Sequence, residues 1–135
     1  MVSQTTRYAL QILGYLAGRR EERVPGDEIA DATGIPSNYL SKILNQLRKS
    51  GMVDSQKGWG GGFTLREEAL KRPISDVMAI IEGSDATLRI DCLFGLPSCD
   101  CENPCPLHPY WESIRDTYHT MLQKVHIADL ADGGR

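Results

Sequence analysis

The chain has 135 residues, of which 41% are hydrophobic and 24% charged, the proportions of an ordinary folded protein. This length allows one domain with an extension and excludes two large domains. No apolar run approaches the length of a membrane-spanning helix, and residues 1–13 lack the features of a signal peptide. We therefore expect a cytoplasmic protein without membrane contact.

The formal net charge is −3, but the charged residues are unevenly distributed along the chain. Residues 37–72 contain seven basic and three acidic side chains, whereas residues 73–135 contain four basic and ten acidic side chains. A basic segment within an acidic protein is typical of a confined surface that binds polyanions.

The N-terminal part of the chain predicts two helices. Apolar residues recur at helical spacing in residues 3–19, where Ser3 or Thr5 can cap the helix. A shorter helix is expected over residues 26–33, and Gly34 ends it.

A third helix is expected over residues 37–50, with Ser37 as its cap and Gly51 as its stop. Its apolar stripe consists of Tyr39, Leu40, Ile43, Leu44 and Leu47. Its polar face has no acidic residue and consists of Asn38, Ser41, Lys42, Asn45, Gln46 and Lys49. A short helix, a glycine-containing turn and such a helix match the helix-turn-helix pattern.

The segment after these helices predicts a β-hairpin, or wing. Two short strands are expected at residues 52–56 and 63–65, and the sequence Lys-Gly-Trp-Gly-Gly-Gly joins them. The glycines let the backbone approach a phosphate, and Lys57 can reach phosphates or a minor groove. A flexible turn beside a merely solvated helix is the alternative. It is less favoured because the helix pair, the wing and the basic excess occur together.

We predict that the third helix and the wing contact a partly palindromic operator in double-stranded DNA. The predicted contact residues are Ser37, Asn38, Tyr39, Ser41, Lys42, Lys57, Gly58 and Gly60. Asn38 has the chemistry to read adenine, and Lys42 to read guanine or bind phosphate.

Two amphipathic helices are expected in the second half. A short one covers residues 74–83, and a long one runs from about residue 109 to residue 125 or beyond. The long helix has apolar residues spaced three and four apart, as in a coiled-coil seam: Trp111, Ile114, Tyr118, Met121 and Val125. We expect this seam to form a homodimer, because helix-turn-helix proteins usually read two half-sites. The alternative is that the helix folds back on its own domain.

All four cysteines lie in residues 91–108, a loop rich in glycine and proline. They are Cys92, Cys99, Cys101 and Cys105, and His108 follows them. Thiolates favour zinc, copper(I) or iron–sulfur clusters. Zinc fits three cysteines with His108, or all four cysteines, although paired C-x-x-C knuckles are absent from the sequence. A disulfide switch, for example between Cys99 and Cys101, and four unused thiols are the other interpretations.

An enzyme is the alternative class of protein. The sequence has no nucleophile elbow, phosphate-binding P-loop or zinc-protease helix. His119 and His126 are seven residues apart on the long helix, which is more typical of surface or seam residues than of catalytic ones. We therefore expect a protein that is not an enzyme.

Several motifs together resemble the Rrf-two family of winged-helix repressors, which includes iron–sulfur, nitric-oxide and cysteine-metabolism regulators. The matching residues are 7–10, 29–30, 39–40, 43–44, 47–53, Gly58, 60–62 and 105–108. The resemblance covers nearly the whole chain. It implies a DNA-binding homodimer in which the long helices pair and the cysteine loop lies beside them.

The resemblance also implies a set of cluster ligands. Cluster-binding members use three cysteines, and either a histidine after the last cysteine or an acidic residue of the partner's first helix. The matching positions here are Cys92, Cys99, Cys105 and His108. No carboxylate lies near Tyr8, which favours the histidine arrangement and a [2Fe–2S] cluster over [4Fe–4S].

The cysteine loop also departs from the family pattern. Six residues rather than the usual five separate Cys92 from Cys99, and Cys101 is an additional thiol. Cys101 can replace Cys99 as a ligand or serve as a resolving thiol, and some family members hold no cluster.

The sequence thus predicts an α+β, mostly helical protein. A winged helix-turn-helix covers residues 1–84, a cysteine-rich sensor loop residues 85–108, and a dimerisation helix and tail residues 109–135. We expect a repressor whose operator binding depends on the cluster. The alternative is the same regulator with a thiol switch or zinc, and a small redox enzyme is less favoured.

Overall fold

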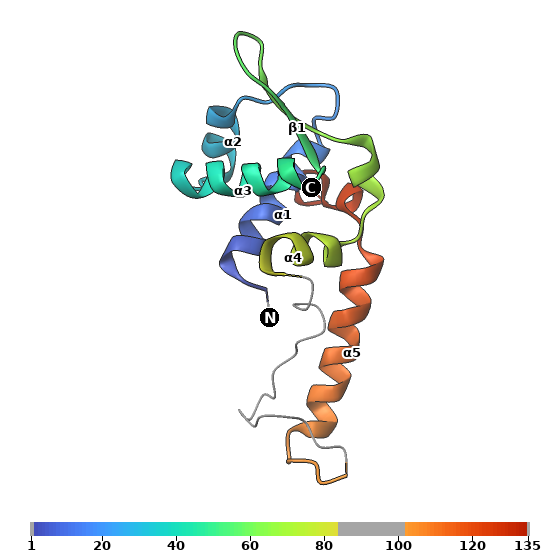
Figure 1. The fold of residues 1–135 in the computed structure, drawn as a ribbon. Helices are drawn as coiled ribbons and strands as arrows, with labels where there is room; N and C mark the ends of the chain where they lie inside the picture. Colours follow the sequence, from blue (N-terminus) through green and yellow to red (C-terminus); the bar gives the residue numbers. More distant parts are fainter. Residues whose placement is uncertain (1, 84–101, 135) are drawn as a thin grey trace.

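The structure is a computed structural model that describes residues 2–83 and 102–134 (Figure 1). Its elements in chain order are α1 (Gln4–Ala17), α2 (Gly26–Thr33), α3 (Ser37–Lys49), β1 (Val53–Gln56), β2 (Gly62–Leu65), η1 (Glu67–Lys71), α4 (Ile74–Glu82), α5 (His108–Lys124) and η2 (Ile127–Gly134). The described part is mostly helical with one two-stranded antiparallel sheet, which confirms the predicted fold class. Within the described ranges, none of the helices is long and apolar enough to cross a membrane.

The first two helices begin and end close to where the sequence predicts. Ser3 caps α1 because its hydroxyl accepts a hydrogen bond from the backbone N–H of Thr6 at 3.1 Å. Gly34 follows α2 with φ of +73°, and its N–H donates to the carbonyl of Ala30 at 2.8 Å. A glycine adopts this left-handed conformation without steric cost, so it ends the helix cleanly.

Helix α3 differs from the prediction at two residues. Pro36, not Ser37, occupies the cap position, and Ser37 is the first residue of the helix. Pro36 already has the extended backbone of a cap residue (φ −56°, ψ 138°), so the helix begins without a side-chain cap. Tyr39 was expected in the apolar stripe, but its side chain is 53% exposed. It lies beside the buried Leu40 on the helix surface, and its ring centroid is 6.3 Å from that of Tyr8.

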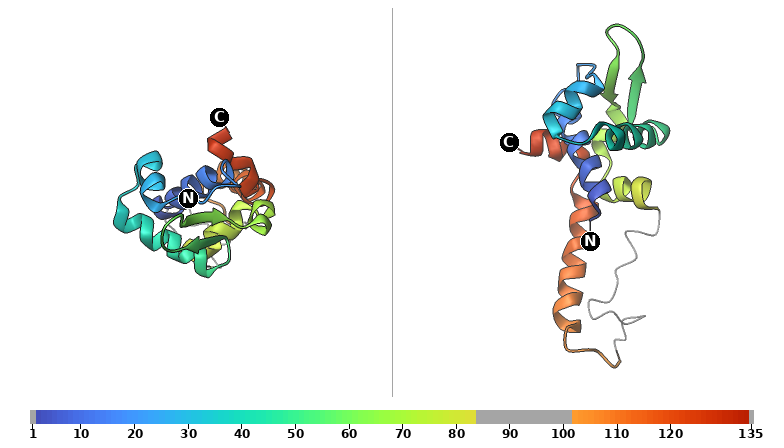
Figure 2. Two further views of the ribbon diagram at one scale, coloured as in Figure 1. Left: turned by 90° about the horizontal axis from the view of Figure 1, so that it is seen from above. Right: turned by 90° about the vertical axis from the view of Figure 1, so that its left-hand side faces the viewer.

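The wing, defined here as residues 53–65, is an antiparallel hairpin with Val53 opposite Leu65 and Gln56 opposite Gly62. A further pair of backbone hydrogen bonds joins Val24 to Phe63 at 2.9 and 2.8 Å. The base of the wing is therefore tied to the segment that enters α2. Figures 1 and 2 show the hairpin projecting at one end of the molecule and α5 extending toward the other.

Helix α1 lies at the centre of the core. Its residues Ile12, Leu13 and Leu16 are almost fully buried, as are Ile29 of α2 and Leu47 of α3. Burial of each large aliphatic side chain stabilises the fold by about 1.5–3 kcal/mol.

The C-terminal part of helix α5 packs on the winged domain. Leu122 is 1% exposed and packs with Ile74 and Met78 of α4. The chain then returns to the domain, where the N–H of Ile127 donates to the carbonyl of Arg72 at 3.0 Å. The 3₁₀ segment η2, which the sequence does not predict and whose backbone is non-helical at Ala131, Asp132 and Gly133, packs across α1.

The predicted coiled-coil seam of α5 is divided between two faces. Tyr118 and Val125 pack toward α4 and η2 within the same chain. In contrast, Ile114 and Met121 are 49% and 44% exposed, and Tyr110 is 73% exposed. These last three residues lie four and seven positions apart, so they form one exposed apolar stripe along α5.

Candidate nucleic-acid interface and sensor site

A groove of about 740 Å³ lies between α2, α3 and the wing. Its walls come from three segments that are distant in the sequence. They are Pro25, Gly26, Asp27 and Ala30 near α2, Ser37, Leu40, Ser41, Leu44, Asn45 and Arg48 of α3, and Ser55, Gln56, Lys57, Gly58, Gly61, Gly62 and Phe63 of the wing. One side of α3, which includes Ser41 and Asn45 of its polar face, therefore lines a concave surface together with the wing.

The predicted DNA-contacting residues divide evenly with respect to this groove. Ser37, Ser41, Lys57 and Gly58 line it. Asn38, Tyr39 and Lys42 are exposed on α3 outside the lining, and Gly60 is exposed in the turn of the wing. The structure thus gathers these residues on exposed parts of α3 and the wing.

Two polar residues of α3 line the groove but were not among the predicted DNA contacts. Asn45 and Arg48 line the groove, and Nη2 of Arg48 donates a hydrogen bond to Oδ1 of Asn45 at 2.7 Å. Their spacing was a usable signal, because residues four and seven positions after Ser41 share its face of a helix.

Part of the basic excess is neutralised within the chain. Arg66 lies 3.4 Å from Asp54 and 3.3 Å from Glu68, and Arg72 lies 2.9 Å from Asp76. The hydrogen bond to Glu68, and then the charge of Asp54, raise the pKa of Arg66. These two arginines are thus engaged with acidic side chains.

Other basic residues keep their charge uncompensated. Over residues 2–83 and 102–134, no ion pair involves Lys42, Arg48 or Lys57. Asp27 is the acidic residue among those that line the groove. The groove and the adjoining surface of α3 thus have a positive balance, which suits a polyanion.

Glycine is required at two positions of the wing, one in its turn and one at the start of β2. A Cβ at Gly61 would clash with the backbone carbonyl oxygen of Gln56. Gly62 has φ of +148°, and a Cβ there would lie 2.7 Å from the carbonyl of Val24. The turn is therefore compact and closely packed against the chain beneath it.

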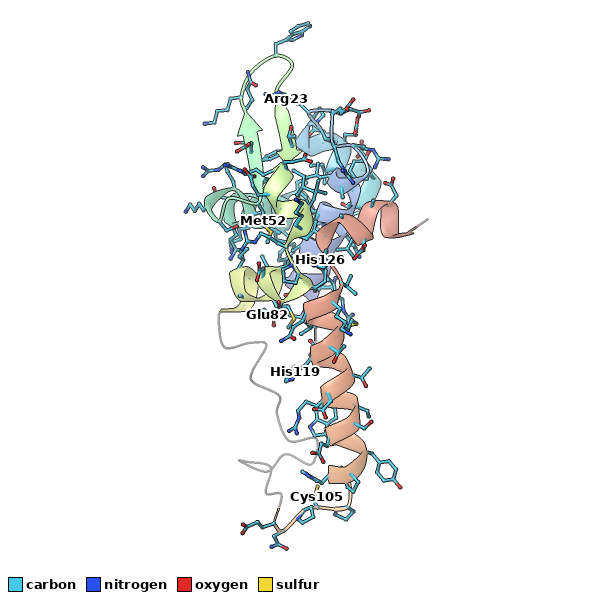
Figure 3. All side chains as sticks on the ribbon, turned by 90° about the vertical axis from the view of Figure 1, so that its right-hand side faces the viewer. Arg23, Met52, Glu82, Cys105, His119 and His126 are labelled. Carbon is cyan, nitrogen blue, oxygen red and sulfur yellow. The ribbon has the colours of Figure 1, made fainter. Side chains whose placement is uncertain are left out.

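Two of the predicted cluster ligands lie at the start of α5. The N–H of His108 donates to the carbonyl of Cys105 at 3.0 Å, so one turn carries both residues. Cys105 is a half-buried free thiol. Figure 3 shows Cys105 at the end of α5 that is remote from Met52 and from the winged domain.

The other three cysteines, Cys92, Cys99 and Cys101, lie outside the described residues. Within the described ranges no group of three or more metal-binding side chains is assembled. Of the ligand set that the sequence suggests, the structure describes Cys105 and His108.

The surroundings of His108 suit a metal ligand. Its side chain is buried, with 8% of the residue exposed, and its Nε2 lies 3.5 Å from the carboxylate of Glu112. Histidines that bind metals usually contact a carboxylate or carbonyl through the other ring nitrogen, which fixes the orientation of the ring. The donor set of a thiol and an oriented imidazole fits a cluster with mixed ligands.

The remaining two histidines form no catalytic group with each other. Nε2 of His119 is buried and has no hydrogen-bond partner among the described residues. His126 is exposed just after the C-terminal end of α5, where its backbone N–H donates to the side-chain carboxylate of Asp129 at 2.9 Å.

Comparisons with known proteins agree with this arrangement. Residues 2–133 match the family model described as Rrf2, iron-dependent transcriptional regulator. A protein of Aquifex aeolicus (strain VF5), named as an HTH-type transcriptional regulator, is 37% identical over 95% of this chain and 89% of its own length. The HTH-type transcriptional regulator IscR of Photorhabdus laumondii is 30% identical over 93% of this chain and 76% of its own length.

Solved structures show the same fold. CymR, the global cysteine regulator of B. subtilis, superposes with a TM-score of 0.76 and 27% identity over 98% of this chain and 96% of that chain. IscR of T. potens superposes with a TM-score of 0.69 and 27% identity over 96% of this chain and 85% of that chain. These relatives are transcriptional regulators and not enzymes, and the protein described here belongs to the same Rrf2 family of DNA-binding transcriptional regulators, the Rrf-two family that its motifs resemble.

Proposed function

We propose that this chain is a homodimeric repressor whose binding to an operator is controlled by an iron–sulfur cluster of the [2Fe–2S] type. In this proposal residues 1–84 bind DNA, residues 85–108 form the sensor, and residues 109–135 provide the dimer helix and tail. Cys92, Cys99, Cys105 and His108 hold the cluster.

One observation carries the cluster proposal. Four cysteines and a histidine fall within residues 91–108, and the last two of them, Cys105 and His108, lie in the turn that leads into α5, where His108 is close to a carboxylate. Three thiolates and a neutral imidazole leave a less negative site than four thiolates, which raises the reduction potential of a bound cluster. Such a cluster supplies a signal by changing its oxidation state or by being lost.

The DNA-binding part of the proposal follows from the groove. Ser37, Asn38, Ser41 and Lys42 of α3 face the major groove, where Asn38 reads adenine and Lys42 reads guanine or binds phosphate. Lys57, with Gly58 and Gly60, contacts the neighbouring DNA backbone or minor groove. The groove's positive balance and its exposed polar side chains support this role.

Helix α5 connects the sensor to the interface. Its 17 residues span about 25 Å, with Cys105 before its first turn and Leu122 packed on α4 near its last turn. The exposed stripe of Tyr110, Ile114 and Met121 supports pairing of two α5 helices. A coupling of about 1–3 kcal/mol between cluster and operator suffices to change operator occupancy.

A thiol switch or a zinc site is the second candidate. Cys101 provides one thiol more than the cluster needs, and the similar structure from B. subtilis is that of a global cysteine regulator. In this alternative, oxidation of two loop thiols replaces cluster chemistry while the same helices bind DNA.

The deciding experiment is a visible absorption spectrum, with iron and sulfide assays, on protein purified without oxygen. Visible absorption with nearly equal amounts of iron and sulfide is expected for a cluster, and the band shape separates [2Fe–2S] from [4Fe–4S]. A colourless protein without iron would overturn the cluster proposal. A zinc assay and a thiol titration would then separate the two forms of the second candidate.

A further inference from the structure

Trp59 is the most exposed large hydrophobic residue among those described. Its relative exposure is 103%, so the surrounding structure shields none of its surface. It lies in the turn between β1 and β2, at residues 57–61 of the wing. An isolated exposed hydrophobic residue is common on protein surfaces, so exposure alone assigns no role to it.

The turn that carries Trp59 has a defined shape. The N–H of Gly61 donates to the carbonyl of Gly58 at 3.0 Å, and Gly58 and Gly60 have φ of +91° and +75°. Below the turn, Val24 and Phe63 tie the hairpin to the domain. The indole therefore stands on a closed, anchored hairpin, which reduces the conformational entropy that it loses on binding.

The charges around Trp59 indicate a polyanionic partner. No acidic residue occurs from Gln56 to Leu65. Lys57 lies two residues before Trp59, and within the described ranges it has no ion pair. The wing also lines the same groove as Ser41, Asn45 and Arg48 of α3. A partner that occupies this groove thus meets the basic side of the hairpin.

We propose that Trp59 is a wedge that enters the DNA minor groove and reads the deformability of a base step. This inference rests on the proposed operator binding. With α3 in the major groove, the wing projects beside it toward the neighbouring minor groove, whose width of about 6 Å admits an indole ring edge-on. Apolar side chains that enter this groove partly unstack a base step and kink the duplex.

The wedge gives the protein a sequence preference at positions that α3 does not contact. Pyrimidine–purine steps such as TA and CA are the most easily kinked, so insertion is favoured at these steps. Trp59 is uncharged and neutralises no phosphate, so it contributes to affinity without contributing to the salt dependence of binding. These two properties separate its role from that of Lys57.

The first test selects binding sites from a pool of random-sequence duplexes with the wild-type protein, Trp59→Ala and Trp59→Phe. We expect all three proteins to select the same core sequence. The wild type and Trp59→Phe should also prefer pyrimidine–purine steps in the flank, and Trp59→Ala should lose this flank preference. On the duplex selected by the wild type, Trp59→Ala should bind about tenfold more weakly, or about 1.4 kcal/mol, with an unchanged salt slope. Trp59→Phe should retain most of the affinity.

The second test uses fluorescence. The chain has two tryptophans, so Trp111→Phe leaves Trp59 as the only tryptophan. Its emission should shift to shorter wavelength and be quenched when the selected duplex is added. Equal affinity and an equal flank preference for Trp59→Ala, or unchanged Trp59 emission on a bound duplex, would overturn the wedge while the proposed operator binding stands. Wild-type protein that selects no sequence would overturn both.

Discussion

Nε2 of His108 lies 3.5 Å from the carboxylate of Glu112, one helical turn further along α5. Because His108 is buried and Glu112 is exposed, the carboxylate can orient the imidazole without being a ligand itself. This contact places an orienting residue for the proposed cluster on the same helix that carries the exposed apolar stripe.

Glu112→Gln should leave the fold and the cluster type unchanged but weaken retention of the cluster. Loss of partners that orient a metal ligand typically lowers metal affinity about 10- to 100-fold. The measurement is the decay of visible absorbance after a chelator is added to protein prepared without oxygen. Glu21→Gln, at an exposed position near the end of α1, is the matched control. Equal decay rates for the two variants would contradict an orienting role for Glu112.

Cys105→Ala should abolish the visible chromophore and leave the thermal melting of the protein nearly unchanged. The thiol is half-buried at the remote end of α5, so little core packing depends on it. Cys101→Ala is the informative comparison, because a resolving thiol is dispensable for cluster binding. A chromophore that persists in Cys105→Ala would remove this cysteine from the ligand set. Loss of the chromophore in Cys101→Ala would indicate that Cys101, in place of Cys99, is a cluster ligand.

Lys57→Ala should weaken binding to all duplex sequences to a similar degree. Each phosphate contact contributes about 0.9 to the slope of log K against log salt, so a dimer that loses two such contacts should lose about two units of slope. Lys71→Ala, an exposed lysine on η1 away from the groove, should change neither quantity. A loss of affinity confined to one base position would show that Lys57 reads a base instead.

Local patterns predicted most of the winged domain because its helices carry strong signals. Gly34 directly follows α2, and Gly51 lies two residues after the end of α3. Both have a positive φ, +73° and +82°, as expected of glycines that end helices. The exposed state of Tyr39 was missed because its position, next to Leu40, lies at the edge of the apolar stripe. There, tertiary contacts rather than periodicity decide how far a side chain is buried, and Tyr39 stays 53% exposed although its ring centroid lies 6.3 Å from that of Tyr8.

The C-terminal part was less predictable because its contacts are long-range. The seam pattern of α5 does not tell which apolar residues meet α4 and which stay exposed. Leu122 became the buried anchor although the predicted seam omitted it. Helix η2 has no local signal of its own, since its position depends on close contact with α1. Likewise, helical spacing places Asn45 and Arg48 on the same face as Ser41, but the fold is needed to show that this face and the wing line one groove.

Gly14→Ala should destabilise the protein although alanine favours helices. A Cβ at this buried position of α1 would lie 2.7 Å from the backbone carbonyl oxygen of Leu130, so η2 must move. Overpacking of this kind typically costs about 1–3 kcal/mol, which denaturant unfolding can measure. Gly26→Ala is the control, because its Cβ would meet only the ring of Phe63 at 3.8 Å. Equal stability of Gly14→Ala and wild type would show that η2 is not closely docked on α1.

Ile114→Glu should separate the proposed dimer into folded monomers. Ile114 is 49% exposed within one chain, so a glutamate there costs the monomer little. Between two paired α5 helices, however, it places two like charges in an apolar contact. Light scattering on size-separated protein measures the mass, and Thr120→Glu, an exposed position on another side of α5, is the control.

The same variant tests how the dimer contributes to operator recognition. A dimer gains affinity because binding of its second half-site is intramolecular, so monomers lose affinity for a full operator far more than for a single half-site. Ile114→Glu should therefore bind full and half sites almost equally, whereas Thr120→Glu should keep the wild-type preference for the full site. A dimeric Ile114→Glu protein with that preference intact would place the dimer contact elsewhere than on the stripe of Tyr110, Ile114 and Met121.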